Sequence, residues 1–253
     1  MKAIILAAGY ATRLYPLTET IAKPLLPVGG RPMIDHLLER LREVEEVDAI
    51  HVVTNHKFAR AFEDWAPPGV TVHDDGTTSE DDRLGAIGDI AFVVRAVELD
   101  DDLLVLAGDN LFDYSLSDFA AWKRAKGEAS AVVLYDVGDL ELVKRYSSVE
   151  LAGTERLTSF TEKPDAPRST LVATAAYLYD RAHVPLLAQY LGDGNPPDQP
   201  GRFIAWLVPR VPVFGYTAGG RWRDIGDAHQ LLEADNELRA EQGLPSRAEY
   251  SVD

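Results

Sequence analysis

Short apolar runs alternate with amphipathic stretches along the first half of the chain. The apolar runs predict β-strands near residues 2–6, 49–54, 70–73 and 102–107. Between them, apolar residues recur three and four positions apart, and this spacing predicts helices at 32–45, 57–65 and 84–96. Alternation of strands with helices is typical of a mostly parallel sheet with helices on both faces, so we expect an α/β fold.

The second half has a different pattern, in which predicted strands follow one another more closely. Apolar runs predict strands at 129–136, 146–151, 156–161, 171–179 and 211–216, and helical spacing predicts helices at 180–191, 202–208 and 227–241. The sheet is therefore expected to become mixed here. A stretch rich in Gly, Pro and Asp at 192–201 predicts a surface loop, either a lid or rim of a site or a disordered bulge. We interpret 1–241 as a single domain and 242–253 as a polar, loosely held tail.

Composition and charge narrow the classes of partner. Of the 253 residues, 46% are hydrophobic, which is enough for a full core, and the absence of Cys excludes disulfides and zinc sites built on sulfur. The formal net charge of −16 argues against nucleic acid and against an anionic membrane, since both require a basic surface. A small anionic ligand needs only local cations inside a cleft. Because no segment is long and apolar enough to span a bilayer, we expect a cytoplasmic protein.

The segment after the first predicted strand has the features of a phosphate site. The small residues Ala7, Ala8 and Gly9 follow the strand directly and let the backbone approach a ligand. Arg13 and Lys23 add positive charge where a polyphosphate would lie. A turn of small residues can also be purely structural, but the two cations favour binding. The stretch lacks the later glycines of a dinucleotide fingerprint and the Gly-Lys-Ser/Thr of a Walker loop, so neither NAD binding nor a P-loop fits.

Two carboxylates occupy comparable positions at the ends of predicted strands. Asp109 follows a buried apolar run, and Asp224 lies at a predicted junction between a strand and a loop. An Asp in such a turn is often only a turn former or a helix cap. Two carboxylates together with phosphate oxygens are nevertheless a usual environment for Mg²⁺, because this ion takes few protein ligands. We therefore expect Asp109 and Asp224 to hold Mg²⁺.

Five motifs occur in a fixed order along the chain. They are Leu6-Ala-Ala-Gly-Tyr-Ala-Thr-Arg-Leu-Tyr-Pro-Leu-Thr18, Lys23-Pro-Leu-Leu-Pro-Val28, Gly108-Asp-Asn110, Glu162-Lys-Pro164 and Trp222-Arg-Asp-Ile-Gly226. In these motifs the chain resembles the sugar-phosphate nucleotidyltransferases, a family that includes the glucose-1-phosphate thymidylyltransferases. The resemblance implies that residues 1–241 form one catalytic domain. It also implies a Rossmann-like, mostly parallel sheet with an added mixed-sheet portion that binds the sugar.

The resemblance further implies substrates and roles for individual residues. The substrates would be a nucleoside triphosphate and a sugar 1-phosphate, and the products an NDP-sugar and pyrophosphate. The residues implied for the base and ribose are Leu6, Ala7, Ala8, Gly9 and Gly85. The residues implied for the reacting phosphates are Arg13, Lys23 and Lys163, with Asp109 and Asp224 as Mg²⁺ ligands. The residues implied for the sugar phosphate are Asn110, Tyr146, Glu162, Lys163 and Thr174.

Three departures from the family pattern leave details open. Ala11 stands where the family has a second loop glycine, so the loop must keep a negative φ there or carry strain. Ser147 follows Tyr146 where the family often has glycine, which leaves the sugar contact open. The segment 82–89 lacks the glutamine that would read a pyrimidine edge, so the preferred base is open as well.

Two other functions also stay open. One is a cytidylyltransferase that acts on phosphocholine or another non-sugar phosphate. It would need an aromatic pocket for an ammonium group, for which Trp206, Trp222 and Tyr177 are candidates. The other is a catalytically silent regulatory homologue. The presence of both presumed metal carboxylates favours an active enzyme, and the oligomeric state is left open.

Overall fold

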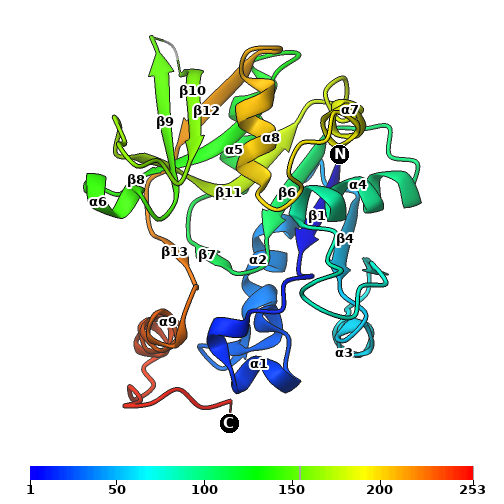
Figure 1. The fold of residues 1–253 in the computed structure, drawn as a ribbon. Helices are drawn as coiled ribbons and strands as arrows, with labels where there is room; N and C mark the ends of the chain where they lie inside the picture. The colour runs from blue at the N-terminus through cyan, green and yellow to red at the C-terminus, as the bar shows by residue number, and fades with distance from the viewer. Residues whose placement is uncertain (154, 253) are drawn as a thin grey trace.

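The computed structural model describes residues 1–153 and 155–252, and its centre is a nine-stranded sheet (Figure 1). The strand order is β5-β4-β1-β6-β11-β8-β12-β10-β9. The strands are β1 (Lys2–Leu6), β4 (Ala49–Thr54), β5 (Val70–Asp74), β6 (Leu103–Ala107), β8 (Ser130–Asp136), β9 (Ser147–Ala152), β10 (Arg156–Glu162), β11 (Leu171–Tyr179) and β12 (Val213–Thr217). Each corresponds to a strand predicted from the apolar runs.

The sheet is parallel in its first half and mixed in its second, as the sequence predicts. Strands β5, β4, β1 and β6 run parallel to one another. Strand β11 then pairs antiparallel with both β6 and β8, and β12 pairs parallel with β8. Strand β10 pairs antiparallel with β12 and with β9. The carboxyl ends of the first four strands therefore lie along one edge, where the loops after them can build a ligand site.

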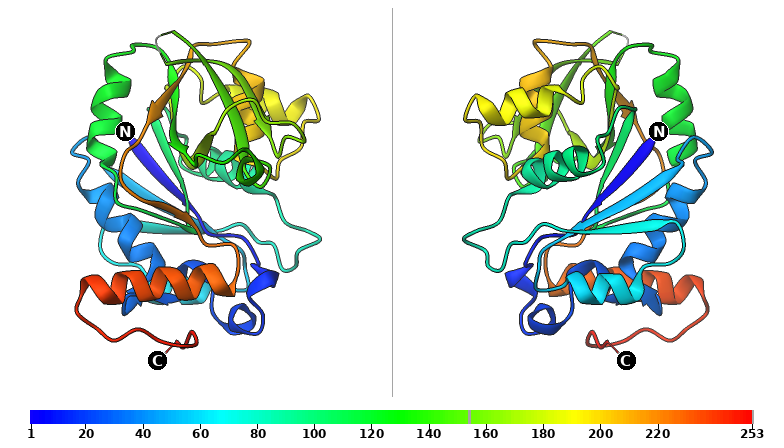
Figure 2. Two further views of the ribbon diagram at one scale, coloured as in Figure 1. Left: turned by 90° about the vertical axis from the view of Figure 1, so that its left-hand side faces the viewer. Right: turned by 90° about the vertical axis from the view of Figure 1, so that its right-hand side faces the viewer.

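Helices cover both faces of the sheet, because successive side chains of a strand point to opposite sides. Ala3 and Ile5 of β1 share a buried cluster with side chains of α2 (Met33–Arg42), α3 (Ala59–Trp65) and α5 (Leu116–Arg124). Ile4 shares a second cluster with side chains of α4 (Ala86–Ala96), α7 (Leu186–Gly192) and α8 (Pro200–Leu207). Figure 2 shows these two helical layers on opposite sides of the sheet. The core is thus two apolar layers divided by the sheet.

A smaller unit lies beyond the carboxyl edge, where α9 (Ala228–Glu241) packs against the loop after β1 (Figure 1). Leu231 of α9 belongs to a third apolar cluster with Leu14, Leu26 and Ile225. The loop carries the short elements η1 (Thr12–Leu14), α1 (Leu17–Thr20), η2 (Lys23–Leu25), β2 (Pro27–Val28) and β3 (Arg31–Pro32). Two further short strands, β7 (Asn110–Phe112) and β13 (Trp222–Asp224), form an antiparallel ribbon, and α6 (Leu140–Val143) precedes β9.

Among the helices longer than one turn, α7 and α5 differ from the prediction. The helix expected at 180–191 begins only at Leu186, because Pro185 has no N–H to donate and the preceding residues form turns around Asp180. Helix α5 was not predicted at all. Its start is marked by Ser115, whose hydroxyl oxygen accepts from the backbone N–H of Asp118 at 3.0 Å. This Ser-x-x-Asp capping pattern was the signal that could have revealed the helix.

The expectation of a loosely held tail is wrong. Arg247 exchanges hydrogen bonds with the side chain of Asn236 on α9 through its backbone N–H and C=O groups, at 2.6 and 2.9 Å. The Tyr250 hydroxyl donates to the Pro27 carbonyl at 2.6 Å. The tail up to residue 252 therefore packs back across α9 onto the loop after β1. No helix in the described part of the chain is long and apolar enough to cross a membrane.

Candidate active site

The loop that follows β1 is fixed by hydrogen bonds to its neighbours. The N–H of Ala7 donates to the Val53 carbonyl of β4 at 2.8 Å, and the N–H of Gly108 donates to the Leu6 carbonyl at 2.8 Å. The side-chain amide of Asn55, which is fully buried, donates to the Ala8 carbonyl at 2.9 Å. These bonds hold the small residues at the carboxyl edge of the sheet.

A cleft of about 400 Å³, called the β1 cleft below, opens beside this loop. The predicted site residues that line it are Leu6, Ala8, Gly9, Arg13, Gly85 and Lys163. They come from the β1 loop, the start of α4 and the end of β10, so the fold brings together residues that are far apart in the sequence. Ala7 lies beneath the loop, in the core cluster on the α2 side. If Ala7 helps to hold a nucleotide, as the sequence predicts, it would do so through its backbone atoms.

Ala11 carries the backbone strain that was one of the two predicted outcomes. Its φ of 48° and ψ of 44° place it in the left-handed region, directly before η1. A side chain in this conformation costs roughly 1–2 kcal/mol. The Thr18 hydroxyl donates to the Ala11 carbonyl at 2.8 Å and helps to hold the loop in this shape.

Gly85 connects the β1 cleft to the loop at 193–199 between α7 and α8. Its φ of 76° and ψ of 158° form a conformation that is nearly confined to glycine. A Cβ at this position would lie 2.9 Å from the carbonyl group of Pro197, which accepts a hydrogen bond from the N–H of Ile87 at 2.7 Å. Asp198 of the same loop lines the β1 cleft. These contacts support the interpretation of this loop as the rim of a site over its interpretation as a disordered bulge.

Lys163 also has a left-handed backbone, with a φ of 44°. Its N–H donates to the Tyr146 carbonyl at 2.7 Å, which ties the end of β10 to the start of β9. Such conformations cost about 1–3 kcal/mol at residues other than glycine and persist only where the surroundings impose them. Here the strained turn places the side chain of Lys163 at the wall of the β1 cleft.

A chain of short polar contacts lies at the ends of β1 and β6. The Lys23 ammonium lies 2.8 Å from Oδ2 of Asp109, and the Asn110 amide donates to Oδ1 of Asp109 at 2.8 Å. Trp222 Nε1 donates in turn to Oδ1 of Asn110 at 2.6 Å. Burial raises the pKa of Asp109, but the Lys23 charge and these hydrogen bonds outweigh it and hold that pKa below its usual range. Asp109 is therefore a carboxylate at neutral pH.

Asp224 lies beside this chain because β13 pairs with β7. It stands opposite Asn110 in the ribbon, and the N–H of the next residue, Ile225, donates to the Asp109 carbonyl at 3.0 Å. Burial and then the neighbouring charge of Asp109 raise the pKa of Asp224 to about 6, against the opposing charges of Lys23, Arg145 and Arg13. Arg13 lines the β1 cleft, but neither Asp109 nor Asp224 is among the described residues that line it.

The Asp109 and Asp224 pair fits the donor set of Mg²⁺. Two close carboxylates repel each other when both are ionised, as the raised pKa of Asp224 reflects, and a divalent cation relieves this repulsion. Within residues 1–153 and 155–252, no group of three or more His, Asp or Glu side chains is arranged to hold a metal. Magnesium does not need such a group, because it takes one or two protein carboxylates and completes its shell with water and phosphate.

A second cavity of about 270 Å³, called the aromatic cavity below, has Asp224 in its wall. Tyr135, Tyr146 and Trp222 line it together with Asp224. The Trp222 ring lies 5.1 Å from that of Tyr146 and 5.8 Å from that of Tyr135. Asn110 does not line this cavity, but its Oδ1 accepts from Trp222, which does. Of the residues predicted for the sugar phosphate, Tyr146 therefore lines the aromatic cavity and Asn110 lies behind its wall.

Two more of the five residues predicted for the sugar phosphate, Glu162 and Thr174, lie elsewhere. Glu162 lines a cavity of about 320 Å³ against α8, where a Cβ at Gly201 would collide with its carboxyl group. Burial raises the pKa of Glu162 to about 7, against the charges of Lys163 and Arg202. Thr174 is 1% exposed, and its hydroxyl forms a hydrogen bond of 2.9 Å with the Tyr114 hydroxyl. Neither lines the β1 cleft or the aromatic cavity, so their contact with a sugar stays a prediction.

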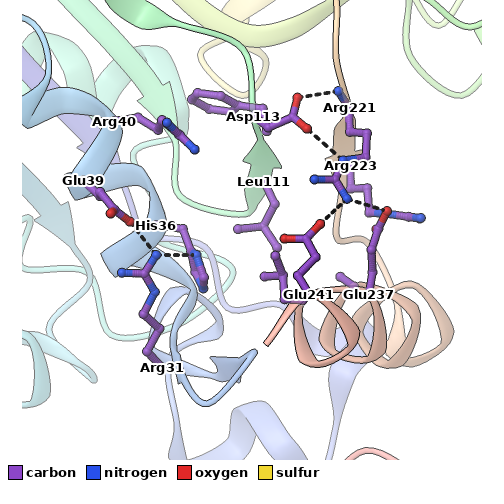
Figure 3. A pocket seen from close by; sticks show the side chains of 13 residues that line it. Arg31, His36, Glu39, Arg40, Leu111, Asp113, Arg221, Arg223, Glu237 and Glu241 are labelled. Carbon is purple, nitrogen blue, oxygen red and sulfur yellow. Dashed lines mark hydrogen bonds and ion pairs between the residues drawn. The ribbon is translucent and has the colours of Figure 1, made fainter. Parts of the chain in front are cut away.

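Ion pairs hold the opposite face of the β7–β13 ribbon, around a cavity of about 120 Å³ (Figure 3). Arg221 pairs with Asp113, Glu237 and Glu241. Arg223 pairs with Glu237, which therefore joins both arginines to α9. Because side chains alternate along a strand, Arg223 points away from the side on which its neighbour Asp224 lies. Helix α9 thereby fixes the strand that carries a predicted metal ligand.

Sequence reasoning missed three polar residues of this region. Asn55 anchors the β1 loop, and its signal was a polar residue directly after the apolar run of β4. Asp75 follows β5 in the same way, and Asp89 lies in the first turn of α4. Both carboxyl groups line the β1 cleft. Asp89 had no distinct signal, because an Asp near a helix start usually has only a capping or dipole role.

A cleft at the carboxyl ends of parallel strands, in a sheet that becomes mixed, defines a Rossmann-like α/β protein with its ligand site at the strand ends. The chain belongs to the nucleotidyl transferase family, whose model matches residues 2–241. This confirms the family resemblance seen in the five motifs.

Several relatives and solved structures are similar over nearly the whole chain. A UTP–glucose-1-phosphate uridylyltransferase of Synechocystis sp. is 31% identical, with 92% of this chain and 62% of the relative covered. A glucose-1-phosphate thymidylyltransferase of Neisseria meningitidis is 32% identical, with 96% and 84% covered. A bifunctional protein GlmU of Methanocaldococcus jannaschii is 27% identical over 94% of the chain, which spans only 54% of that relative.

The solved structures agree with this assignment of the fold. The structure of a putative glucose-1-phosphate thymidylyltransferase from Bacillus anthracis in complex with a sucrose has a TM-score of 0.75 and 25% identity, and covers 94% of this chain and 95% of that one. An apo UDP-glucose pyrophosphorylase has a TM-score of 0.80 at 21% identity, with 95% and 98% covered, and so shows the shared fold alone.

Proposed function

We propose that the protein transfers a nucleoside monophosphate from a nucleoside triphosphate to a sugar 1-phosphate, which yields an NDP-sugar and pyrophosphate. The observation that carries this proposal is the convergence of Arg13 and Lys163 on the β1 cleft. The Lys23–Asp109 pair lies at the same strand ends, because the N–H of Gly108 donates to the carbonyl of Leu6, which lines the cleft. The N–H of Ile225 in turn ties the segment of Asp224 to the Asp109 carbonyl. These three cations and two carboxylates come from four segments of the chain, since Arg13 and Lys23 share the loop after β1. The names of the relatives point to the same reaction.

The reaction requires no general base from the protein. A phosphate monoester has its second pKa near 6, so the attacking oxygen of the sugar 1-phosphate is already ionised at neutral pH. A bond forms between this oxygen and the α-phosphorus, while the bond from that phosphorus to the bridging oxygen of the β-phosphate breaks. Pyrophosphate leaves with the electron pair of that bond, and no proton needs to move. The protein's task is therefore positioning and charge neutralisation.

The cations of the cleft offset the repulsion between two polyanions. Arg13 would bind the phosphates of the triphosphate, Lys23 the phosphates at the reacting centre, and Lys163 the phosphate of the acceptor. A single well-placed donor of this kind contributes roughly 3–4 kcal/mol to transition-state stabilisation. The strained backbone at Lys163 suits such a role, because it fixes the direction of the side chain.

Asp109 and Asp224 would hold Mg²⁺, which when bound supplies positive charge to the phosphate oxygens. Lys23 already compensates one of the two carboxylates at 2.8 Å. The raised pKa of Asp224 shows that the second is left undercompensated, which favours a further cation there. A dependence of the activity on Mg²⁺ is part of this proposal.

The experiment that tests the proposed function is a screen of pyrophosphate release. Each nucleoside triphosphate is combined with a panel of sugar 1-phosphates and with phosphocholine, with Mg²⁺ and with EDTA. Pyrophosphate release that requires one sugar 1-phosphate supports the proposal. Asp109→Asn and Asp224→Asn are each expected to lose most of the turnover, whereas Asp113→Asn, on the other face of the ribbon, is the matched control. Near-normal turnover in both variants would exclude the metal assignment, and no release with any sugar 1-phosphate would refute the function.

One observation keeps a second candidate acceptor in the screen. Three aromatic rings line the aromatic cavity with the carboxylates of Asp136, Asp224 and Glu233, an environment that also suits an ammonium group. The ammonium pocket expected from Trp206, Trp222 and Tyr177 is not formed, because Trp206 lines the cavity against α8 and Tyr177 is 3% exposed in the core. Phosphocholine is therefore the second acceptor to test. A cytoplasmic location stays a prediction.

A further inference from the structure

The short turn after β2 is seated on helix α9. The N–H of Gly29, in this turn, donates to the carboxylate of Asp235 on α9 at 2.8 Å, and Asp235 is 1% exposed. A Cβ at Gly29 would lie 2.7 Å from the Cβ of Leu238, so the backbone of the turn and the helix are in direct contact. Gly29 follows Lys23 within the same loop. Helix α9 therefore supports the segment that carries a predicted reacting cation.

The tail at 242–252 adds two hydrogen bonds to the same turn. The side-chain amide of Gln242 donates to the Gly29 carbonyl at 2.9 Å, and the Tyr250 hydroxyl donates to the Pro27 carbonyl at 2.6 Å. Tyr250 also packs against the apolar cluster that contains Leu26. The tail lies beyond residues 2–241, which the family model matches, so its role cannot be inferred from the family.

The tail is itself anchored on α9. Figure 1 shows it, in red, returning from the end of α9 towards the loop that carries α1. The backbone of Arg247 exchanges two hydrogen bonds with the side chain of Asn236, and Nε of Arg239 donates to the Pro245 carbonyl at 2.9 Å. Tyr250 therefore reaches the turn from a fixed base.

The segment between Lys23 and the turn is stiff. Pro24 and Pro27 each have a fixed φ. The N–H of Leu26 donates to the Lys23 carbonyl at 3.1 Å, and the N–H of Met33 donates to the Leu26 carbonyl at 3.0 Å. A displacement of the Pro27 carbonyl is therefore passed on to Lys23, because few free dihedral angles remain to absorb it.

We propose that Tyr250 and Gln242 are positioning residues for the reaction, which hold the turn at 27–29 on α9 and thereby fix the place of the Lys23 ammonium. This inference rests on the proposed function, in which Lys23 binds the phosphates at the reacting centre. Lys23 is 9% exposed and lies 2.8 Å from Asp109, so the backbone that carries it decides where its ammonium lies. A shift of about 1 Å in such a group can cost about a hundredfold in rate.

The alternative is a tail that only stabilises the folded state. Neither Tyr250 nor Gln242 is among the described residues that line the β1 cleft or the aromatic cavity, so both interpretations exclude direct contact with a substrate there. A purely stabilising tail changes the fraction of folded molecules and leaves the kcat of each folded molecule unchanged. A positioning tail lowers that kcat, because a displaced cation stabilises the transition state less, and it leaves the KM for the triphosphate nearly unchanged.

The test compares Tyr250→Phe with a matched control in the full chain. Tyr250→Phe keeps the ring and removes only the hydroxyl that donates to Pro27. Ser117→Ala, the control, removes a hydroxyl of α5 that donates to the Glu43 carbonyl at the same distance of 2.6 Å. Pyrophosphate-release kinetics at saturating acceptor give kcat and KM, and circular dichroism gives the folded fraction.

We expect Tyr250→Phe to lower kcat about threefold or more, with the KM for the triphosphate changed less than about twofold. Tyr250→Phe combined with Gln242→Ala should lower kcat about tenfold or more, and Ser117→Ala should change neither constant. Gln242→Ala alone takes the place of any variant that does not fold. An unchanged kcat of the folded variants, or a change confined to KM, overturns the proposal.

Hydrogen exchange adds a measurement that does not depend on activity. If the tail holds the turn, the backbone amides of Leu26 and Gly29 should exchange faster in Tyr250→Phe than in the parent, and not in Ser117→Ala. Faster exchange with an unchanged kcat would show that the tail only stabilises the fold. If the parent releases no pyrophosphate with any sugar 1-phosphate, the proposed function and this inference are both refuted. Normal kinetics of Tyr250→Phe beside an active parent refute this inference alone.

Discussion

Gly85→Ala tests the contact between the start of α4 and the rim of the β1 cleft. The change adds a Cβ at a residue with a φ of 76° and a ψ of 158°. Backbone strain of this kind costs about 1–3 kcal/mol. The new Cβ also lies 2.9 Å from both the C and O atoms of Pro197 and 3.1 Å from the Cα of Asp198, which are backbone atoms that cannot rotate away. Overpacking of this kind adds about 1–3 kcal/mol.

The matched control is Gly127→Ala, in the turn after α5. Gly127 has a φ of 70°, and a Cβ there meets no atom within 4 Å in the described structure. This control therefore carries the cost of the left-handed backbone alone, about 1–2 kcal/mol. We expect Gly85→Ala to lower the free energy of unfolding by roughly 1–3 kcal/mol more than Gly127→Ala does, the size of the overpacking contribution.

Urea unfolding followed by circular dichroism, with linear extrapolation, measures this difference. Pyrophosphate-release kinetics measure the second effect, since a displaced rim should raise the KM for the triphosphate in Gly85→Ala and not in Gly127→Ala. Equal stability of the two variants would show that Gly85 does not pack on the rim. An unchanged KM together with the expected loss of stability would remove Gly85 from the nucleotide site.

Three further predictions follow from individual contacts. Ala11→Gly removes strain worth roughly 1–2 kcal/mol, and the greater entropy of the unfolded chain takes back about 0.4–1 kcal/mol. Urea unfolding should therefore show a free energy of unfolding equal to that of the parent or up to about 1.6 kcal/mol above it. A loss of about 1 kcal/mol or more would contradict the left-handed assignment. Burial, and then the charges of His73 and Lys2, lower the pKa of His51 to about 4. As the pH drops from 6.5 towards 4, the unfolded state therefore binds the His51 proton before the folded state does, and the free energy of unfolding falls. Between pH about 7.5 and about 5.5, His51→Gln should lose about 1 kcal/mol less of this free energy than the parent, and equal losses would refute the pKa shift. Glu237→Gln loosens both Arg221 and Arg223 and should raise the Mg²⁺ concentration for half-maximal activity. Glu241→Gln, which loosens Arg221, should change that concentration less. The same Mg²⁺ response in both variants would mean that the network does not position Asp224.

The sequence by itself determined the fold class and the order of the elements. Periodicity of apolar residues depends on local geometry, which is why each strand of the sheet was predicted within a few residues of its place. The motif after β1 likewise identified Arg13 and the small residues that line the cleft, because they lie within one loop. Errors arose where local signals were weak or overridden, as at the start of α7 before Leu186 and in the tail that Tyr250 ties to Pro27.

Only the tertiary structure decided which distant side chains meet. Trp222 and Asn110 form a hydrogen bond across 112 residues, and Glu162 faces α8 although its neighbour Lys163 faces the β1 cleft. The hydrogen bond between the side chains of Asp75 and Asp89 was also invisible, since neither residue belongs to a motif. Contacts of this kind depend on the packing of whole elements, whose free energy is shared among many residues and leaves no pattern at any single position. Local chemistry therefore identified the loop that is predicted to bind phosphate, and the packing of the sheet and α9 decided which groups face it.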